Sequence, residues 1–227
     1  MSKALVVLSG GQDSTTCLYW ALRQYDEVVA VTFDYGQRHA IEIEAAREIA
    51  EYAGIEWELV RMPPLGGDSP LTELAREVRQ YESADALPGG IEDTFVPGRN
   101  IIFFALAANR AASLGCETII AGLSQEDFGG YPDCRRVFVD AMEKAVNLGL
   151  EGTAAKIVIE TPLINMSKKE TVLLAQEVGA MEALALSHTC YNGERPPCGH
   201  CHACLLRQKG FEEAGVEDPL LSGRNYG

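Results

Sequence analysis

The fold of this chain is decided near its start, by the stretch Leu5-Val6-Val7-Leu8-Ser9-Gly10-Gly11-Gln12-Asp13-Ser14. Its apolar first half is typical of a buried strand, and the apolar residues Cys17, Leu18, Ala21 and Leu22 that follow have helical spacing. The two glycines in between allow a tight turn and a close approach of the backbone to an anion. Backbone N–H groups at the start of a helix point at such an anion, and the helix dipole favours its charge. The stretch therefore predicts a phosphate-binding turn.

Two common kinds of phosphate turn do not match this stretch. The chain has no Walker pattern Gly-x4-Gly-Lys-Ser/Thr, and no Gly-x-Gly-x-x-Gly at the first strand–helix turn. Residues 9–14 instead resemble the SGGxDS loop of the N-type ATP pyrophosphatases, the PP-loop family. This resemblance implies that the loop grips the β- and γ-phosphates of ATP while a substrate oxygen attacks the α-phosphate, releasing pyrophosphate. The candidate ATP-binding residues are Leu8, Ser9, Gly10, Gly11, Gln12, Asp13, Ser14, Thr15, Thr16, Cys17, Leu18, Thr32 and Phe33.

The composition is that of an ordinary globular protein. The 227 residues are 47% hydrophobic and 23% charged, which fits one large domain with at most a small appendage. We find no apolar run long enough to cross a bilayer and no signal-peptide pattern, so we expect a cytoplasmic protein without a membrane partner. The net charge of −14 disfavours nucleic-acid binding, which depends on Lys and Arg. We therefore expect a small-molecule substrate.

Apolar stretches with strand character alternate with stretches of helical spacing. The predicted strands are 4–8, 28–33, 57–61, 118–122 and 157–160, and the predicted helices are 14–24, 40–53, 71–79, 100–114, 135–148 and 168–178. This order predicts an α/β fold with an open, mostly parallel, doubly wound sheet, Rossmann-like and, by the PP-loop resemblance, of the adenine nucleotide alpha hydrolase type. We expect a PP-loop and substrate domain over 1–186, a small zinc-binding appendage with a C-terminal helix over 187–213, and a tail over 214–227.

Four of the seven cysteines crowd together near the C-terminus, at Cys190, Cys198, Cys201 and Cys204. Their C-x7-C-x2-C-x2-C spacing can supply four thiolates to one tetrahedral Zn²⁺ with no position open for water, so it predicts a structural zinc site. An iron–sulfur cluster is the alternative, because the last three reproduce the C-x2-C-x2-C part of the ferredoxin pattern, but the x3-Cys-Pro continuation is missing. We expect the scattered cysteines to be small buried apolar residues; they are Cys17, Cys116 and Cys134.

Several other segments make the resemblance more specific. Residues 33–39, 95–100, 130–135 and 190–201 resemble, in this order along the chain, the 7-cyano-7-deazaguanine synthases. That resemblance implies a homodimeric ligase that converts 7-carboxy-7-deazaguanine, ammonia and ATP with Mg²⁺ into the 7-nitrile, a precursor of queuosine. It also implies adenylation of the carboxylate, formation of an amide and a second activation. The PP-loop unit and the metal segment leave no room for a glutaminase domain, so we expect free ammonia as the nitrogen donor.

The candidate substrate-binding residues are polar or aromatic. Arginine suits bidentate contacts with phosphate or carboxylate, while a carboxylate can accept from the N–H groups of a guanine-type base. These candidates are Tyr35, Gln37, Arg38, Arg99, Asn100, Tyr131, Asp133 and Arg135.

The candidate catalytic residues are Asp13, Ser14, Arg99 and Lys168. Asp13 is a candidate ligand of Mg²⁺, and Lys168, in a segment that resembles the S-K-x-E of PP-loop enzymes, would offset phosphate charge in the transition state. Plainer roles stay open: a helix cap for Asp13 or Asn100, solvated surface positions for the arginines, and a charged first helical turn for Lys168.

Two other functions stay open at this point. A tRNA-thiolating PP-loop enzyme would use the cysteines for sulfur or iron, but it predicts a basic RNA-binding surface that the composition does not favour. A non-catalytic nucleotide-binding module is the second alternative.

Overall fold

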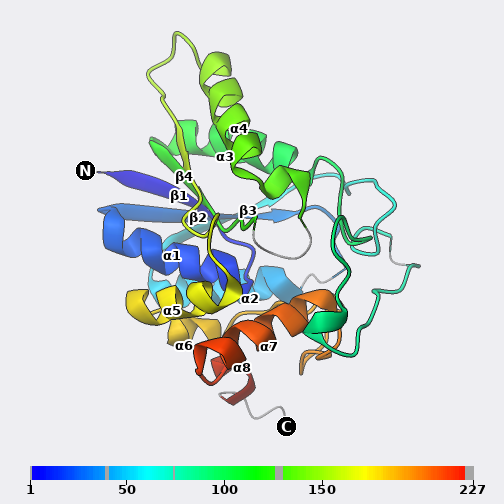
Figure 1. Ribbon diagram of the computed structural model, residues 1–227. Helices are drawn as coiled ribbons and strands as arrows, with labels where there is room; N and C mark the ends of the chain where they lie inside the picture. The colour runs from blue at the N-terminus through cyan, green and yellow to red at the C-terminus, as the bar shows by residue number, and fades with distance from the viewer. Residues whose placement is uncertain (1, 39–40, 74, 126–129, 223–227) are drawn as a thin grey trace.

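The computed structural model describes residues 2–38, 41–73, 75–125 and 130–222, and its centre is a five-stranded parallel sheet (Figure 1). The strands are β1 (Lys3–Val7), β2 (Glu27–Asp34), β3 (Glu56–Arg61), β4 (Thr118–Ala121) and β5 (Val158–Glu160), in the order β3-β2-β1-β4-β5. The chain winds outward on one side of β1 and then on the other, so the strand order reverses between β1 and β4. Ligands of open α/β sheets bind beside such a reversal.

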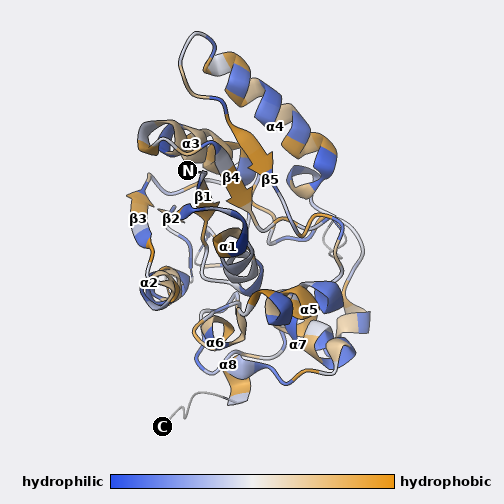
Figure 2. Ribbon diagram, turned by 90° about the vertical axis from the view of Figure 1, so that its left-hand side faces the viewer, coloured by the Kyte–Doolittle hydropathy of each residue, from blue (hydrophilic) through white to orange (hydrophobic). Residues whose placement is uncertain are grey.

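Two pairs of helices cover the two faces of the sheet. α1 (Gln12–Gln24) and α2 (Ile41–Ala53) lie on one face, and α3 (Arg99–Leu114) and α4 (Arg136–Gly149) lie on the other (Figures 1 and 2). The strands between these layers are coloured as hydrophobic in Figure 2, because a parallel sheet covered on both faces needs apolar side chains on both. The predicted doubly wound α/β fold is confirmed.

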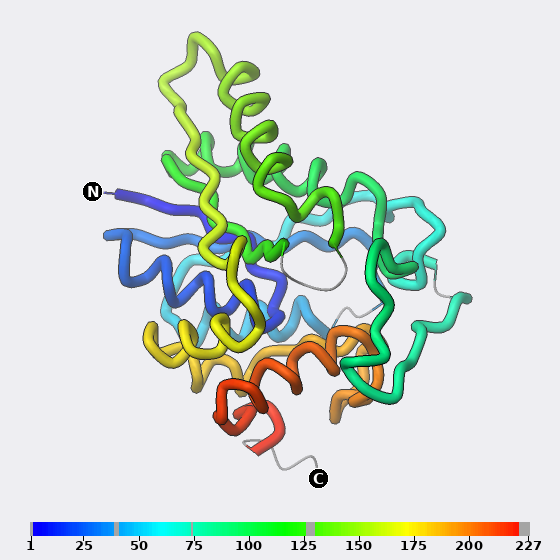
Figure 3. Tube along the Cα trace, viewed as in Figure 1, coloured from blue at the N-terminus to red at the C-terminus, as the bar shows by residue number. Residues whose placement is uncertain are grey.

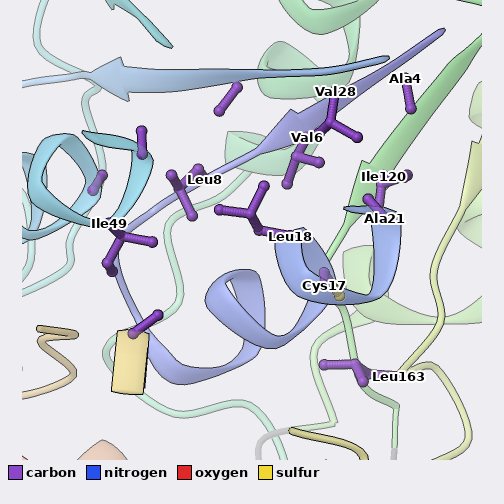
Figure 4. Close-up of a cluster of buried hydrophobic side chains, with 14 residues drawn as sticks. Ala4, Val6, Leu8, Cys17, Leu18, Ala21, Val28, Ile49, Ile120 and Leu163 are labelled. Atoms are coloured by element: carbon purple, nitrogen blue, oxygen red, sulfur yellow. The ribbon is translucent and has the colours of Figure 1, made fainter. Parts of the chain in front are cut away.

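Each face of the sheet has its own hydrophobic core, and alternate residues of a strand point to opposite faces. The core beneath α1 and α2 is shown in Figure 4 and includes Ala4, Val6, Leu8, Leu18, Val28, Ile49 and Ile120. The core beneath α3 and α4 includes Leu5, Val29, Val31, Phe104, Ile119, Val139 and Ile159.

The C-terminal third of the chain adds a helical layer outside α1. It contains α5 (Lys168–Val178), α6 (Met181–Leu184), α7 (His202–Ala214) and α8 (Pro219–Ser222). α7 runs beside α5, with Phe211 buried in a cluster that includes Val172 and Ala175 (Figure 3). A buried ion pair, Arg207 Nε to Asp218 Oδ2 at 2.6 Å, fixes the end of this layer. None of the helices in the described ranges is long and apolar enough to traverse a membrane.

The predicted helix over 71–79 is wrong. The described residues of this range form turns and irregular structure. A short 3-10 helix, η1 (Ala84–Ala86), follows before α3, and a second one, η2 (Pro132–Cys134), lies between β4 and α4. The carbonyl groups of Leu71, Glu73 and Arg76 accept hydrogen bonds from Arg38 instead of from N–H groups four residues on. These contacts fix the range as a turn that wraps around the Arg38 side chain.

The chain between β3 and α3 reaches the C-terminal segment. Gln80 makes an isolated antiparallel bridge with Cys201, and Tyr81 N donates to the carbonyl of His200 at 2.9 Å. This long connection and the cysteine segment therefore lie side by side, as Figure 3 shows.

Candidate active site

The Ser9–Ser14 turn joins β1 to α1 at the C-terminal edge of the sheet. Gly11 is the N-cap of α1, and no side chain caps the helix there. The hydroxyls of Ser9 and Ser14 lie 3.0 Å apart, and Ser9 N donates to Ser14 Oγ at 3.1 Å. The turn is thus held in shape by its own hydroxyls while the helix N-terminus is left for an anion.

Gly10 is enclosed on two sides. Its φ is +89°, and a Cβ built there would lie 2.3 Å from the carbonyl oxygen of Glu42 and 2.8 Å from the N of Ala46. On the other side, His188 N donates to the Gly10 carbonyl at 2.8 Å. The phosphate turn is therefore positioned by the backbone of α2 and by the segment that leads to the cysteines.

A cavity of about 300 Å³ opens beside this turn. Loops that follow β1, β2 and β4 line it, as expected for one rim of a parallel sheet. Of the sequence-predicted residues, the structure brings together Leu8, Ser9, Gly11, Gln12, Asp13, Ser14, Thr32, Phe33, Tyr35, Gln37, Arg99, Asn100, Tyr131 and Lys168 around it.

Asp13 and Lys168 meet on the wall of the cavity. Lys168 Nζ lies 2.7 Å from Asp13 Oδ2, while Asp13 Oδ1 is buried with no hydrogen-bond partner among the described residues. Lys168 opens α5 inside a capping box formed by Ser167 and Glu170. A Cβ on Gly210 of α7 would lie 2.9 Å from Lys168 Cβ, so α7 presses directly on this position.

Arg99 contributes a half-buried positive charge to the far wall. It is the first residue of α3, and its Nη1 lies 3.5 Å from the hydroxyl of Tyr35. Neighbouring phenol groups raise the pKa of Arg99 further although burial opposes this, so it stays a cation. The helix dipole disfavours a cation at this end of a helix, so the position of Arg99 is not explained by helix stability. A cation at a helix N-terminus facing a cavity is suited to an anionic ligand.

Aromatic and amide side chains complete this wall. Tyr131 packs its ring 5.2 Å from that of Phe95, and its hydroxyl lies 2.7 Å from Thr94 Oγ1. Burial raises the pKa of Tyr131 to about 12, so the phenol stays protonated near neutral pH. Asn100 Nδ2 donates to the carbonyl of Asp133 at 3.1 Å, which ties α3 to the loop before α4.

Other predicted residues lie outside the cavity lining. Arg38 donates from Nε to the carbonyl of Pro70 at 3.1 Å and holds the 70–76 loop, and Arg135 donates to the carbonyl of Gly130 at 3.0 Å. Asp133 is buried behind the wall, where burial raises the pKa of its carboxyl. The remaining predicted residues that do not line the cavity are Gly10, Thr15, Thr16, Cys17 and Leu18, of which the last four are buried in α1.

One cysteine differs from expectation. Cys17 and Cys116 are buried as predicted, but Cys134 is half-buried and lines the cavity. It ends η2 at the cavity edge, where Asn100 Nδ2 lies 3.5 Å from its sulfur.

The four C-terminal cysteines converge. The sulfur atoms of Cys190, Cys198, Cys201 and Cys204 all lie within 4.8 Å of one another. A tetrahedral ion with Zn–S bonds of about 2.3 Å places its sulfur ligands roughly 3.8 Å apart, and the sulfurs of Cys198 and Cys204 are 4.0 Å apart. The cluster therefore fits a single tetrahedral metal ion.

Sequence reasoning missed part of the cavity. Glu42, Thr189, Tyr191 and His202 also line it. Glu42 looked like one of several acidic residues in an amphipathic helix, and only its place in the first helical turn, next to the loop after β2, could have drawn attention to it. The other three are close in sequence to the metal ligands, but no pattern shows that the metal segment is also a cavity wall.

The fold and this cavity define a doubly wound α/β protein whose cavity opens beside a glycine turn that resembles the PP-loop. A family model described as "Queuosine biosynthesis protein QueC" matches residues 3–215. The chain is 56% identical to the 7-cyano-7-deazaguanine synthase of Gloeobacter violaceus over 99% of this chain and 97% of that protein. It is 46% identical to the synthase of the same name from Bacillus subtilis, over 93% of this chain and 94% of that protein. The chain belongs to the QueC family of queuosine biosynthesis proteins.

Solved structures are less similar. The U34-tRNA thiolase NcsA from Methanococcus maripaludis with its [4Fe-4S] cluster has a TM-score of 0.44 and 18% identity, over 93% of this chain and 65% of that chain. A likeness this distant says nothing about substrate or metal.

Proposed function

We propose that this chain is the ligase that converts 7-carboxy-7-deazaguanine, ammonia and ATP into 7-cyano-7-deazaguanine, AMP and pyrophosphate. The observation that carries the proposal is a single cavity that joins the Ser9–Ser14 phosphate turn to the cation of Arg99. Relatives that are 44–56% identical over at least 93% of this chain carry the name of this synthase.

The phosphate turn suits activation of a carboxylate. A carboxylate is a poor electrophile because its leaving group would be oxide, and transfer of AMP to it replaces oxide with a good leaving group. The helix N-terminus at Gly11 would hold the β- and γ-phosphates, and Lys168 would offset the charge that develops at the α-phosphate. Arg99 would hold the substrate carboxylate, and Tyr131 would contact the deazapurine ring.

The nitrile requires two activations. Ammonia displaces AMP from the acyl adenylate to give a primary amide, whose oxygen then attacks a second ATP. Loss of AMP and protons from that adduct leaves the carbon–nitrogen triple bond. One cavity can serve both activations, because the acid and the amide differ only in one substituent of the reacting carbon.

Two metal ions are part of the proposal. Asp13 would hold Mg²⁺ through its buried Oδ1, which lacks a hydrogen-bond partner among the described residues; the ion would neutralise ATP phosphate charge.

The cysteine cluster would hold Zn²⁺ structurally, since four thiolates leave no position for water. An iron–sulfur cluster spreads its four thiolates over two or four iron atoms and so needs a wider site than sulfurs within 4.8 Å. Purified protein should be colourless and contain about one zinc per chain; a brown protein would contradict this.

The net charge of −14 supports a further part of the proposal, that the chain acts on the free base rather than on RNA. We also propose, from the family resemblance, that it uses free ammonia and works as a homodimer in the cytoplasm. The alternative, a tRNA-thiolating enzyme, is not favoured by a composition with 19 basic and 33 acidic residues.

The test is incubation with 7-carboxy-7-deazaguanine, MgATP and ammonium, with mass spectrometry of the base and quantification of the nucleotides. Nitrile, AMP and pyrophosphate are expected, and replacing ammonium with glutamine should abolish the product. ADP and phosphate as the only nucleotide products would contradict adenylation.

A further inference from the structure

Two carboxylates line the cavity among the residues that the structure describes, Asp13 and Glu42. Asp13 is paired with Lys168 at 2.7 Å, beside the phosphate turn. Glu42 lies in the first turn of α2, and its backbone carbonyl abuts Gly10 of the same turn. Glu42 therefore brings a carboxylate into the cavity next to the place where phosphate would bind.

The position of Glu42 is unusual for an acidic residue in a first helical turn. Such residues are normally exposed to solvent and stabilise the helix by interacting with its dipole, as the exposed Glu44 does in the same turn. Burial instead raises the pKa of Glu42 to about 8, although the charge of Arg99 lowers it. The charge of Glu42 also raises the pKa of the Tyr35 and Tyr191 hydroxyls. Glu42 therefore lies near Arg99 of α3, the loop after β2 and the cysteine segment.

The chemistry of nitrile formation needs a proton acceptor. The nitrogen of a nitrile carries no hydrogen, so all three N–H protons of ammonia must leave after it attacks the acyl adenylate. A general base acts best when its pKa is close to the pH of the solution, because it can then take up a proton and release it again in each step. Asp13, held by a lysine and next to the phosphates, is poorly suited to this task.

We propose that Glu42 is the general base of this site, which accepts N–H protons during amide and nitrile formation; the proposal rests on the function given above. In the first half, the nitrogen lone pair attacks the acyl carbon, Glu42 takes one N–H proton, and AMP leaves with the electron pair of the C–O bond. In the second half, the activated amide loses its two N–H protons to Glu42 in turn. The electron pair of the last N–H bond becomes the third C–N bond, and the C–O bond breaks to release AMP.

The test separates adenylation from the steps that follow it. In Glu42→Gln, exchange of labelled pyrophosphate into ATP that depends on the acid should stay within about threefold of wild type, because adenylation requires no N–H proton to leave. Formation of amide and nitrile from ammonium should fall by roughly 100-fold or more. Hydroxylamine, which is largely unprotonated at neutral pH, should still trap the acyl adenylate as the hydroxamate.

Matched variants complete the experiment. Glu44→Gln removes an equal charge from the exposed part of the same turn and should leave every rate unchanged, and Glu42→Asp should restore part of the nitrile rate. Nitrile formation at the wild-type rate in Glu42→Gln would overturn the role of Glu42 and leave the proposed function standing. A parallel loss of pyrophosphate exchange would show that Glu42 binds the substrate instead, which also overturns it. Wild-type protein that makes no nitrile would overturn the proposed function and this role together.

Discussion

Lys168 Nζ and Asp13 Oδ2 lie 2.7 Å apart although 155 residues separate them in the chain. The two side chains are 14% and 25% exposed, so the pair is shielded from bulk water by α1, α5 and α7. α7 reaches this place because Gly210 lets it press on Lys168. The first and last thirds of the chain thus meet at the phosphate turn.

Replacing this lysine should impair adenylation selectively. In Lys168→Met the acid-dependent exchange of pyrophosphate into ATP should fall by about 100-fold, because one preorganised charge at a transition state contributes on that scale. Lys169→Met, an exposed neighbour in the same helix, is the control and should exchange at the wild-type rate. Equal exchange in the two variants would mean that Lys168 serves only to begin α5.

The enclosure of Gly10 predicts a steric effect. Gly10→Ala should lower the free energy of unfolding by about 2–4 kcal/mol, since it combines a left-handed backbone with a clash against Glu42 and Ala46. Gly54→Ala has a φ of +69° but nothing within 4 Å of the new Cβ, so it should cost only about 1–2 kcal/mol. Urea unfolding measures both, and ATP binding should be lost only in Gly10→Ala. Indistinguishable unfolding curves would rule out the close packing at Gly10.

Removal of the metal should weaken nucleotide binding. Cys190 is two residues from His188, whose N–H holds the Gly10 carbonyl, and Thr189 and Tyr191 line the cavity. Cys201→Ser should lose the metal, lower the melting temperature by roughly 10 °C and weaken ATP binding. Cys116→Ser changes a buried cysteine outside the cluster and should retain the metal. Unchanged ATP affinity in metal-free protein would show that the two sites are independent.

The pKa of Glu42 predicts a pH dependence of stability. Its value of about 8 in the folded protein exceeds the value of about 4.3 in an unfolded chain, so the folded state binds more protons in between and the free energy of unfolding falls as pH rises. Glu42→Gln removes this loss. Relative to wild type it should therefore gain about 2–3 kcal/mol between pH 6 and pH 8.5, measured by urea unfolding at both values. Glu44→Gln should show no such gain, and a gain of equal size there would refute the assignment to Glu42.

Local pattern was enough for much of the architecture. The strands, the phosphate turn and the helices that flank it follow from apolar periodicity and glycine placement, because these properties depend on neighbours within a few residues. The same reasoning failed at residues 71–79, where apolar spacing suggested a helix. There the backbone acceptors are used by Arg38, from a different loop, and no local pattern contains that information.

The amino-acid sequence alone determined the class of fold, the glycine turn after β1 and the grouping of the four cysteines, because each depends on residues close together in the chain. Only the tertiary structure decided that Arg38 supports a loop, that Glu42 faces the cavity and that the cysteine segment forms a cavity wall. These placements depend on how α2, α3 and α7 pack around the end of β1, and packing joins residues that lie far apart along the chain.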